Sequence, residues 1–183
     1  STGVNEKYLD DVSLKGLICS MDIDETVSGA DIVVLALPSG VVLSVVDDLL
    51  PHLRSEQILL DLAKGLAPGD QLISEVIGEK LAAANLACQL CVMMGPTIAP
   101  ELARGVYTTA LVTSGDVALA QDLASLLTTK TLKLSAATDS LGSEYWGAFK
   151  NVIALACGVV DGLKEDGRGG DNLKAAVFTA GYK

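Results

Sequence analysis

An uninterrupted apolar run that ends at a proline constrains the fold of this chain more than any other feature. The run covers residues 31–37, with the sequence Asp-Ile-Val-Val-Leu-Ala-Leu, and Pro38-Ser39-Gly40 follows it. A run with no polar alternation is typical of a strand that is covered on both faces. We therefore expect residues 31–37 to form a central strand of a parallel sheet.

Strand and helix patterns alternate along the first three-quarters of the chain. The predicted strands, besides 31–37, are 14–20, 57–62, 87–94, 108–113 and 131–134, and the predicted helices are 24–28, 41–50, 70–84, 98–104 and 117–127. This alternation predicts an α/β fold, a Rossmann-like doubly wound parallel sheet with right-handed crossovers. The low aromatic content of 4% agrees, because a core of Leu, Val, Ile and Ala suits a buried parallel sheet.

The pattern changes at about Thr138. A long helical stretch is predicted for residues 143–163, followed by a charged, Gly-rich loop at 164–170 and a second helix from Asp171. We therefore expect two units, an incomplete α/β domain at residues 1–137 and the start of an all-helical domain at residues 138–183. Ser1 is not a methionine and Lys183 lies inside a helical pattern, so we expect both ends to be cut from a longer protein.

Charge and hydropathy exclude several classes of partner. The net charge of −10 argues against nucleic acid. We see no apolar run long enough to span a membrane and no signal peptide, so we expect no transmembrane segment.

Four cysteines indicate a reducing compartment. Cys88 and Cys91 form a CxxC, which can be a redox pair or half of a zinc site. On a strand, residues three apart point to opposite faces, so we expect the two sulfurs to diverge. With one histidine and no second CxxC, we expect no metal site. We expect all four cysteines, including Cys19 and Cys157, to be buried, reduced thiols, as in a cytoplasmic protein.

Three predicted strands end in loops that suit a ligand. These loops are Pro38-Ser39-Gly40, Lys64-Gly65 and residues 95–99, Gly-Pro-Thr-Ile-Ala. Ligands of open α/β sheets bind at the carboxyl ends of the strands, where backbone N–H groups and a cation suit phosphate or a polarised oxygen. Taken singly, each loop can equally be a helix start, a solvated lysine or a plain turn. Together they favour a binding crevice.

Lys150 and Asn151 interrupt the apolar helical pattern Gly147–Ala154. A lysine among Ala, Val, Ile and Gly must find an anion, lose its proton or take part in a reaction, unless its side chain reaches the surface. Near neutral pH an ammonium group can protonate a carbonyl oxygen as hydride arrives at the carbon.

At these residues the chain resembles the NAD(P)-dependent glycerol-3-phosphate dehydrogenase family. Five pieces match in order and spacing over nearly the whole chain: residues 30–39, Lys64-Gly65 with Ser74-Glu75-Val76, Gly95–Glu101, Gly147–Ala154 and Gly170–Ala176. The resemblance implies hydride transfer between NAD or NADP and dihydroxyacetone phosphate, a phosphorylated small-molecule substrate, to give sn-glycerol 3-phosphate. It also implies a homodimer.

The resemblance implies roles for single residues as well. Lys150 is expected to be the catalytic acid and base, and Lys64 to contact both substrate and nicotinamide. Gly95, Thr97 and Asn151 are expected on the substrate side. Pro38 and Ala99 are expected to contact the cofactor.

The chain also departs from the family. No G-x-G-x-x-G dinucleotide loop occurs in it, and neither does the family's distal Arg-Asn pair for the substrate phosphate. We therefore expect these residues alone to be nearly inactive. Two alternatives stay open: a non-catalytic fragment or scaffold of such an enzyme, and another dehydrogenase of the β-hydroxyacid or 6-phosphogluconate type.

Overall fold

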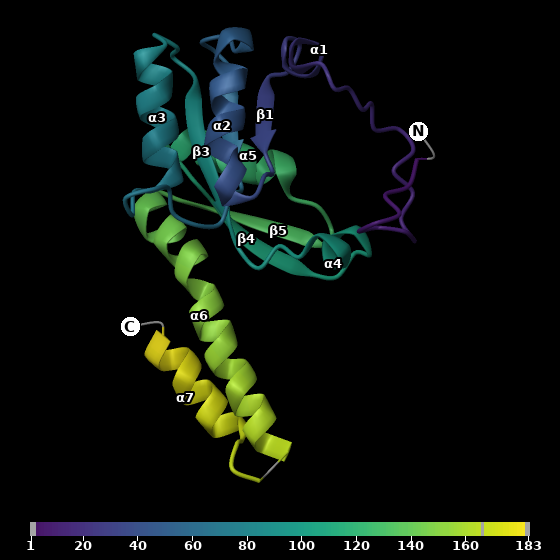
Figure 1. Ribbon diagram of the computed structural model, residues 1–183, viewed down its shortest axis with the longest axis vertical. Coiled ribbons are helices and arrows are strands. Elements are labelled where there is room, and N and C mark those ends of the chain that lie inside the picture. The colour runs from purple at the N-terminus through teal and green to yellow at the C-terminus, as the bar shows by residue number, and fades with distance from the viewer. Residues whose placement is uncertain (1–2, 166, 182–183) are drawn as a thin grey trace.

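In the part of the chain that the structure describes, five strands form one sheet in the order in which they occur along the chain (Figure 1). The structure is a computed structural model that describes residues 3–165 and 167–181. The strands are β1 (Ile32–Leu35), β2 (Ile58–Asp61), β3 (Gln89–Met94), β4 (Thr108–Thr113) and β5 (Leu132–Ala137). All five lie within or overlap predicted strands.

Helices connect the strands and then extend away from them. The helices are α1 (Ile23–Val27), α2 (Ser39–Leu49), the short 3-10 helix η1 (Leu50–His52), α3 (Ile73–Ala83), α4 (Ala99–Ala103), α5 (Val117–Leu127), α6 (Ser140–Glu165) and α7 (Asp171–Gly181). Each predicted helix is present, and α6 begins three residues earlier than its pattern indicated.

The sheet is not fully parallel, contrary to the prediction, because β4 runs in the opposite direction to β3. Strands β1, β2 and β3 run parallel, β4 runs antiparallel to β3, and β5 runs parallel to β4. Each of the three connections between neighbouring parallel strands contains an 11-residue helix. Helix α4 between β3 and β4 has five residues and spans only about 7.5 Å, so it does not carry the chain back along the sheet. The sheet is therefore mostly parallel and Rossmann-like, with one reversed pair.

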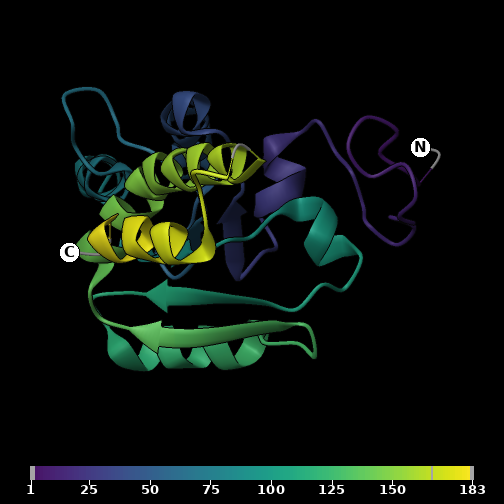
Figure 2. The ribbon, with the colours of Figure 1, turned by 90° about the horizontal axis from the view of Figure 1, so that it is seen from below.

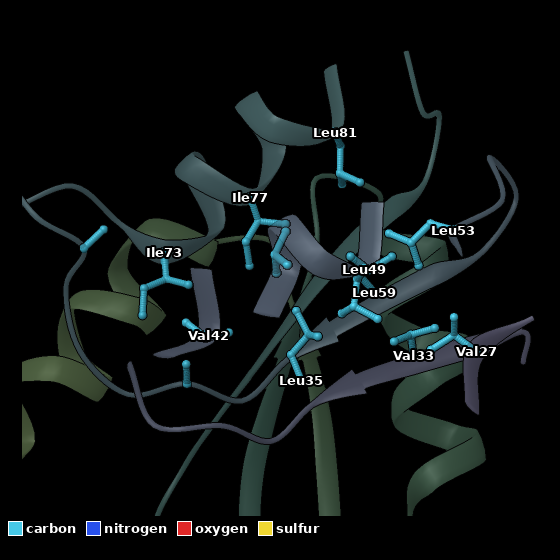
Figure 3. Packing of buried hydrophobic residues seen from close by; sticks show 13 residues of the cluster. Val27, Val33, Leu35, Val42, Leu49, Leu53, Leu59, Ile73, Ile77 and Leu81 are labelled. Atoms are coloured by element: carbon cyan, nitrogen blue, oxygen red, sulfur yellow. The ribbon is translucent and has the colours of Figure 1, made fainter. Parts of the chain in front are cut away.

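Apolar side chains cover both faces of the sheet, as a doubly wound fold requires. One cluster joins β1 and β2 to α2 and α3 and contains Val42, Leu59 and Ile77 (Figure 3). The other joins the opposite face to α5 and contains Val112 and Leu123. Figure 2 shows α5 beside β4 and β5, away from α2 and α3. Each layer buries the apolar residues that alternate along its strands or recur along its helices.

Two strand predictions were wrong in detail. Residues 14–20 form no strand in the described part of the chain, and Ile18 is 95% exposed. A strand needs a hydrogen-bonding partner, and this segment lies away from the sheet beside α1 (Figure 1). In addition, β1 is an edge strand rather than a central one, and Val34 is half-exposed.

The predictions about the cysteines hold for Cys88 and Cys91 but not for Cys19. The side chain of Cys88 packs with the α2–α3 cluster, whereas Cys91 is buried in the α5 cluster, so the two sulfurs diverge as predicted. All four cysteines are free thiols. Burial was wrongly predicted for Cys19, which is exposed because its segment joins no layer of the core.

Helices α6 and α7 form a hairpin that projects from the sheet (Figure 1). Lys164 pairs with Asp171 at 2.9 Å, and Lys174 pairs with Asp161 at 2.6 Å, so ion pairs join the two helices near the turn. Gly170 lies in the connection between them, within the loop predicted for residues 164–170.

Helix α6 is the one helix among the described residues that is long and apolar enough to cross a membrane. By length and composition, residues 140–164 could cross a bilayer, and little of this helix is buried. One helix of this kind is weak evidence for a span, because apolar helices that pack in a protein core pass the same test.

Candidate functional site

Three strand ends converge on one pocket. Because β1, β2 and β3 are parallel, the loops after them meet at the same edge of the sheet. The pocket has a volume of about 480 Å³. Its wall includes Pro38 and Ser39 after β1, Lys64 after β2, and Thr97 and Ala99 after β3. The crevice predicted from the three loops is therefore present.

Lys64 crosses this pocket to the loop after β3. Its Nζ donates a hydrogen bond to Thr97 Oγ1 at 2.8 Å. The next residue, Gly65, lies against the start of α2, where an added Cβ would come within 2.7 Å of Ser39 Oγ. A glycine is thus needed for the β2 loop to approach α2 closely.

Lys150 reaches the same loop from α6. Its Nζ donates a hydrogen bond to the Gly95 carbonyl oxygen at 3.2 Å. Helix α6 approaches the end of β3 at Gly147, where an added Cβ would lie 2.6 Å from Met94 Sδ. Gly95 is equally confined, because its added Cβ would lie 2.6 Å from Ala110 Cβ on β4. Two close glycine contacts therefore bring the lysine to the loop.

The two ammonium groups influence each other. Burial lowers the pKa of Lys64, and the positive charge of Lys150 lowers it further. Burial also lowers the pKa of Lys150. Two half-buried cations at one loop would both be stabilised by an anion placed between them, which would offset the cost of their burial. The arrangement can hold a phosphorylated or polarised oxygen and can deliver a proton to it.

The other predicted residues occupy different positions. Pro38 precedes the first residue of α2, and Ala99 is the first residue of α4, so both lie at helix starts on the pocket wall. Asn151 is exposed and lines a separate hollow on α6 with Ala154 and Leu155. The structure thus brings together Lys64, Lys150, Gly95 and Thr97, with Pro38 and Ala99 beside them, and leaves Asn151 outside.

Two buried acids near the site were missed from the sequence. Asp61, the last residue of β2, is fully buried, and its Oδ1 accepts a hydrogen bond from the Ala63 N–H at 3.0 Å. Its Oδ2 has no hydrogen-bond partner among the described residues. Burial, together with the charge of Glu144, raises the pKa of Asp61 to about 6. The only signal in the sequence was an acid at the end of an apolar strand.

Glu144 is the second buried acid, with 2% of its surface exposed. Its carboxylate accepts hydrogen bonds from the Ser74 N–H at 3.1 Å and from the Ser74 hydroxyl. Burial raises the pKa of Glu144, and the two bonds from Ser74 partly oppose that rise. In the sequence it looks like an ordinary helix glutamate, because its partner lies 70 residues away.

The chain matches known sequences over nearly its whole length. Residues 1–120 match the sequence model of the NAD-dependent glycerol-3-phosphate dehydrogenase N-terminus, and residues 139–183 match that of its C-terminus. A glycerol-3-phosphate dehydrogenase (NAD(P)+) of Clostridium perfringens is 35% identical over 179 residues, which are 97% of this chain and 52% of that protein. One of Syntrophotalea carbinolica is 38% identical over 180 residues, with the same two shares.

Solved structures show the same fold. The glycerol-3-phosphate dehydrogenase of Coxiella burnetii superposes with a TM-score of 0.82 and 28% identity, covering 98% of this chain and 53% of that one. The enzyme of Saccharomyces cerevisiae gives a TM-score of 0.79 and 29% identity, with shares of 97% and 52%. The chain therefore spans about half the length of the relatives that it matches.

Proposed function

The chain belongs to the NAD-dependent glycerol-3-phosphate dehydrogenase family, and on that premise we propose that it contributes the proton donor and part of the substrate site for reduction of dihydroxyacetone phosphate to sn-glycerol 3-phosphate. The observation that carries the proposal is the meeting of Lys64 and Lys150 on the Gly95–Thr97 loop. This loop lies beside a pocket at the carboxyl ends of parallel strands, the usual ligand position in such sheets.

The pocket fits the reactive end of a nicotinamide dinucleotide, NAD or NADP. Its volume of about 480 Å³ is within the usual range for small-molecule sites. Pro38 and Ala99 are the residues that would contact the cofactor. When bound, the nicotinamide supplies the hydride.

Lys150 is proposed as the general acid. Its ammonium group donates a proton to the carbonyl oxygen of dihydroxyacetone phosphate while the carbonyl carbon accepts the hydride, and it recovers the proton in the opposite direction. The lowered pKa of Lys150 favours this role, because a donor with a pKa closer to neutrality gives up its proton more readily.

Lys64 is proposed to orient the substrate. Its ammonium group already binds the hydroxyl of Thr97 and has donors left for an oxygen of the substrate. The backbone of Gly95 and the hydroxyl of Thr97 complete this side of the site. Asn151 is proposed to support the site from α6, a role that requires its side chain to turn from the exposed hollow that it now lines.

A homodimer is proposed through the α6–α7 hairpin. Several large apolar side chains of these helices are exposed: Phe149, Val152, Leu155, Val159, Leu173 and Phe178. Exposed apolar patches of this kind are typical of interaction surfaces. A second copy of the chain would cover them.

The activity is tested by NADH oxidation with dihydroxyacetone phosphate. We expect the 183-residue chain to be nearly inactive, and a version extended at both ends with the corresponding residues of the Clostridium perfringens relative to turn over. Robust turnover by the short chain would refute the expectation that it is incomplete. An extended version that folds, as judged by circular dichroism, but stays inactive would favour a scaffold over an enzyme.

A further inference from the structure

Glu144 ties α6 to the rest of the molecule beside the pocket. Its carboxylate is buried at the point where α6 crosses the N-terminus of α3, and both hydrogen bonds from Ser74 end on it. Ser74 is the second residue of α3, so its N–H is one of the first-turn donors that no carbonyl within the helix can satisfy. A carboxylate at this end of a helix also interacts favourably with the helix dipole.

This contact is one of few that hold the catalytic end of α6. Below it the helix projects away from the sheet, as Figure 1 shows. Only its upper part contacts β3, with Gly147 against Met94. Lys150 lies six residues after Glu144, about 9 Å further along the helix axis. Because a helix is stiff over this length, the position of Glu144 determines the height and rotation at which Lys150 meets the Gly95 carbonyl.

The surroundings of Glu144 make the two bonds from Ser74 important. The acidic groups that face it are Asp61 from β2 and Glu75 from α3, and both carry charge of the same sign. The N–H and the hydroxyl of Ser74 both donate to this carboxylate and stabilise its charge. A buried carboxylate that loses such donors is strongly destabilised where it lies.

We propose that Glu144 is a positioning residue, which through its two hydrogen bonds from Ser74 holds α6 so that Lys150 lies against the Gly95 carbonyl. The proposal deepens the role of Lys150 and rests on the proposed function for its catalytic meaning. Its structural content does not depend on that function, because the location of Lys150 can be measured in the 183-residue chain alone.

The test measures the state of Lys150 directly. The amino groups of the chain are labelled with a trace of an acylating reagent over a range of pH values, and mass spectrometry gives the labelling midpoint of each lysine. Burial lowers the pKa of Lys150, so its labelling midpoint should lie below the ordinary range for a lysine. When Lys150 moves into solvent, its midpoint rises.

Four variants separate positioning from general destabilisation. Ser74→Ala and Glu144→Ala should each raise the Lys150 midpoint by about half a pH unit or more, because the lysine regains water. Ser74→Thr keeps both donors and should keep the wild-type midpoint. Ser143→Ala is the matched control, since the Ser143 hydroxyl donates to the carbonyl oxygen of Asp139, one residue before α6. It should leave the midpoint unchanged even if it lowers the melting temperature.

The outcomes are decisive in either direction. An unchanged Lys150 midpoint in Ser74→Ala and Glu144→Ala overturns the proposal, and so does an equal shift in Ser143→Ala. In the extended version the same two variants should lower kcat more than they raise the KM for NADH. If the midpoint shifts and the extended wild type shows no turnover, the positioning stands and the proposed function fails.

Discussion

At the scale of single residues, the buried carboxyl of Asp61 makes the folded protein less stable when it is ionised. A buried carboxyl with one unpartnered oxygen prefers to be neutral, and its pKa is raised from the ordinary value to about 6. Compared with the unfolded chain, the folded protein therefore favours the neutral form of this carboxyl. The cost of ionising it appears as the pH rises above the unfolded pKa of about 4, and it is complete above the folded pKa.

Replacement of Asp61 by asparagine should remove this cost. Asp61→Asn keeps the acceptor for the Ala63 N–H, so we expect it to raise the free energy of unfolding at pH 8 by at most about 3 kcal/mol. The gain should shrink steadily as the pH falls towards 4. Urea unfolding across this range measures it, with Asp122→Asn on the exposed face of α5 as the control. A gain that is independent of pH would contradict the assignment of the raised pKa.

The sequence indicated some of these residues and hid others. Lys150 was recognisable because an ammonium group in a small, apolar helix is costly wherever it is placed. Asp61 and Glu144 were missed because their burial depends on partners distant in the chain, Glu144 on Ser74 above all. Asn151 was predicted together with Lys150, but successive residues of a helix point about 100° apart, and the structure places it outside the pocket.

At the scale of elements, local sequence patterns predicted the helices and strands better than they predicted how the strands pair. The apolar periods of α2, α3 and α5 and the strands between them are local properties, and the structure has all of them. The direction of β4 and the edge position of β1 depend on contacts between segments. The segment 14–20 has a strand-like composition but lacks a partner in the described part of the chain.

The packing of β3 against β4 should depend on Gly95. An added methyl group would meet Ala110 and the Thr109 carbonyl oxygen at 2.6–2.9 Å, and these are backbone or short side-chain atoms that cannot turn aside. We expect Gly95→Ala to lower the free energy of unfolding by about 1–3 kcal/mol. Gly78→Ala in α3 is the matched control, because open space surrounds that position and alanine favours a helix by up to about 1 kcal/mol. Chemical denaturation of both variants tests this, and equal stabilities would contradict it.

At the scale of the whole molecule, the apolar face of the α6–α7 hairpin should control assembly. Leu155 is 73% exposed in the middle of that face. We expect the wild-type chain to sediment as a dimer at micromolar concentration and Leu155→Ser to sediment as a monomer, because a buried leucine contributes about 2 kcal/mol per copy. Lys133→Ser on β5 is the control. A monomeric wild type, or a dimer that survives Leu155→Ser, would contradict this interface.

Delivery of the proton by Lys150 can be tested by one kinetic comparison. In the extended version, kcat/KM for NADH-dependent reduction of dihydroxyacetone phosphate is compared between wild type, Lys150→Ala and Lys164→Ala, in which the replaced lysine lies near the far end of α6. We expect Lys150→Ala to lower kcat/KM about 10²–10⁴-fold, as the loss of a general acid does, and Lys164→Ala to leave it nearly unchanged. A Lys150→Ala variant with wild-type turnover would contradict the role of Lys150 as the proton donor.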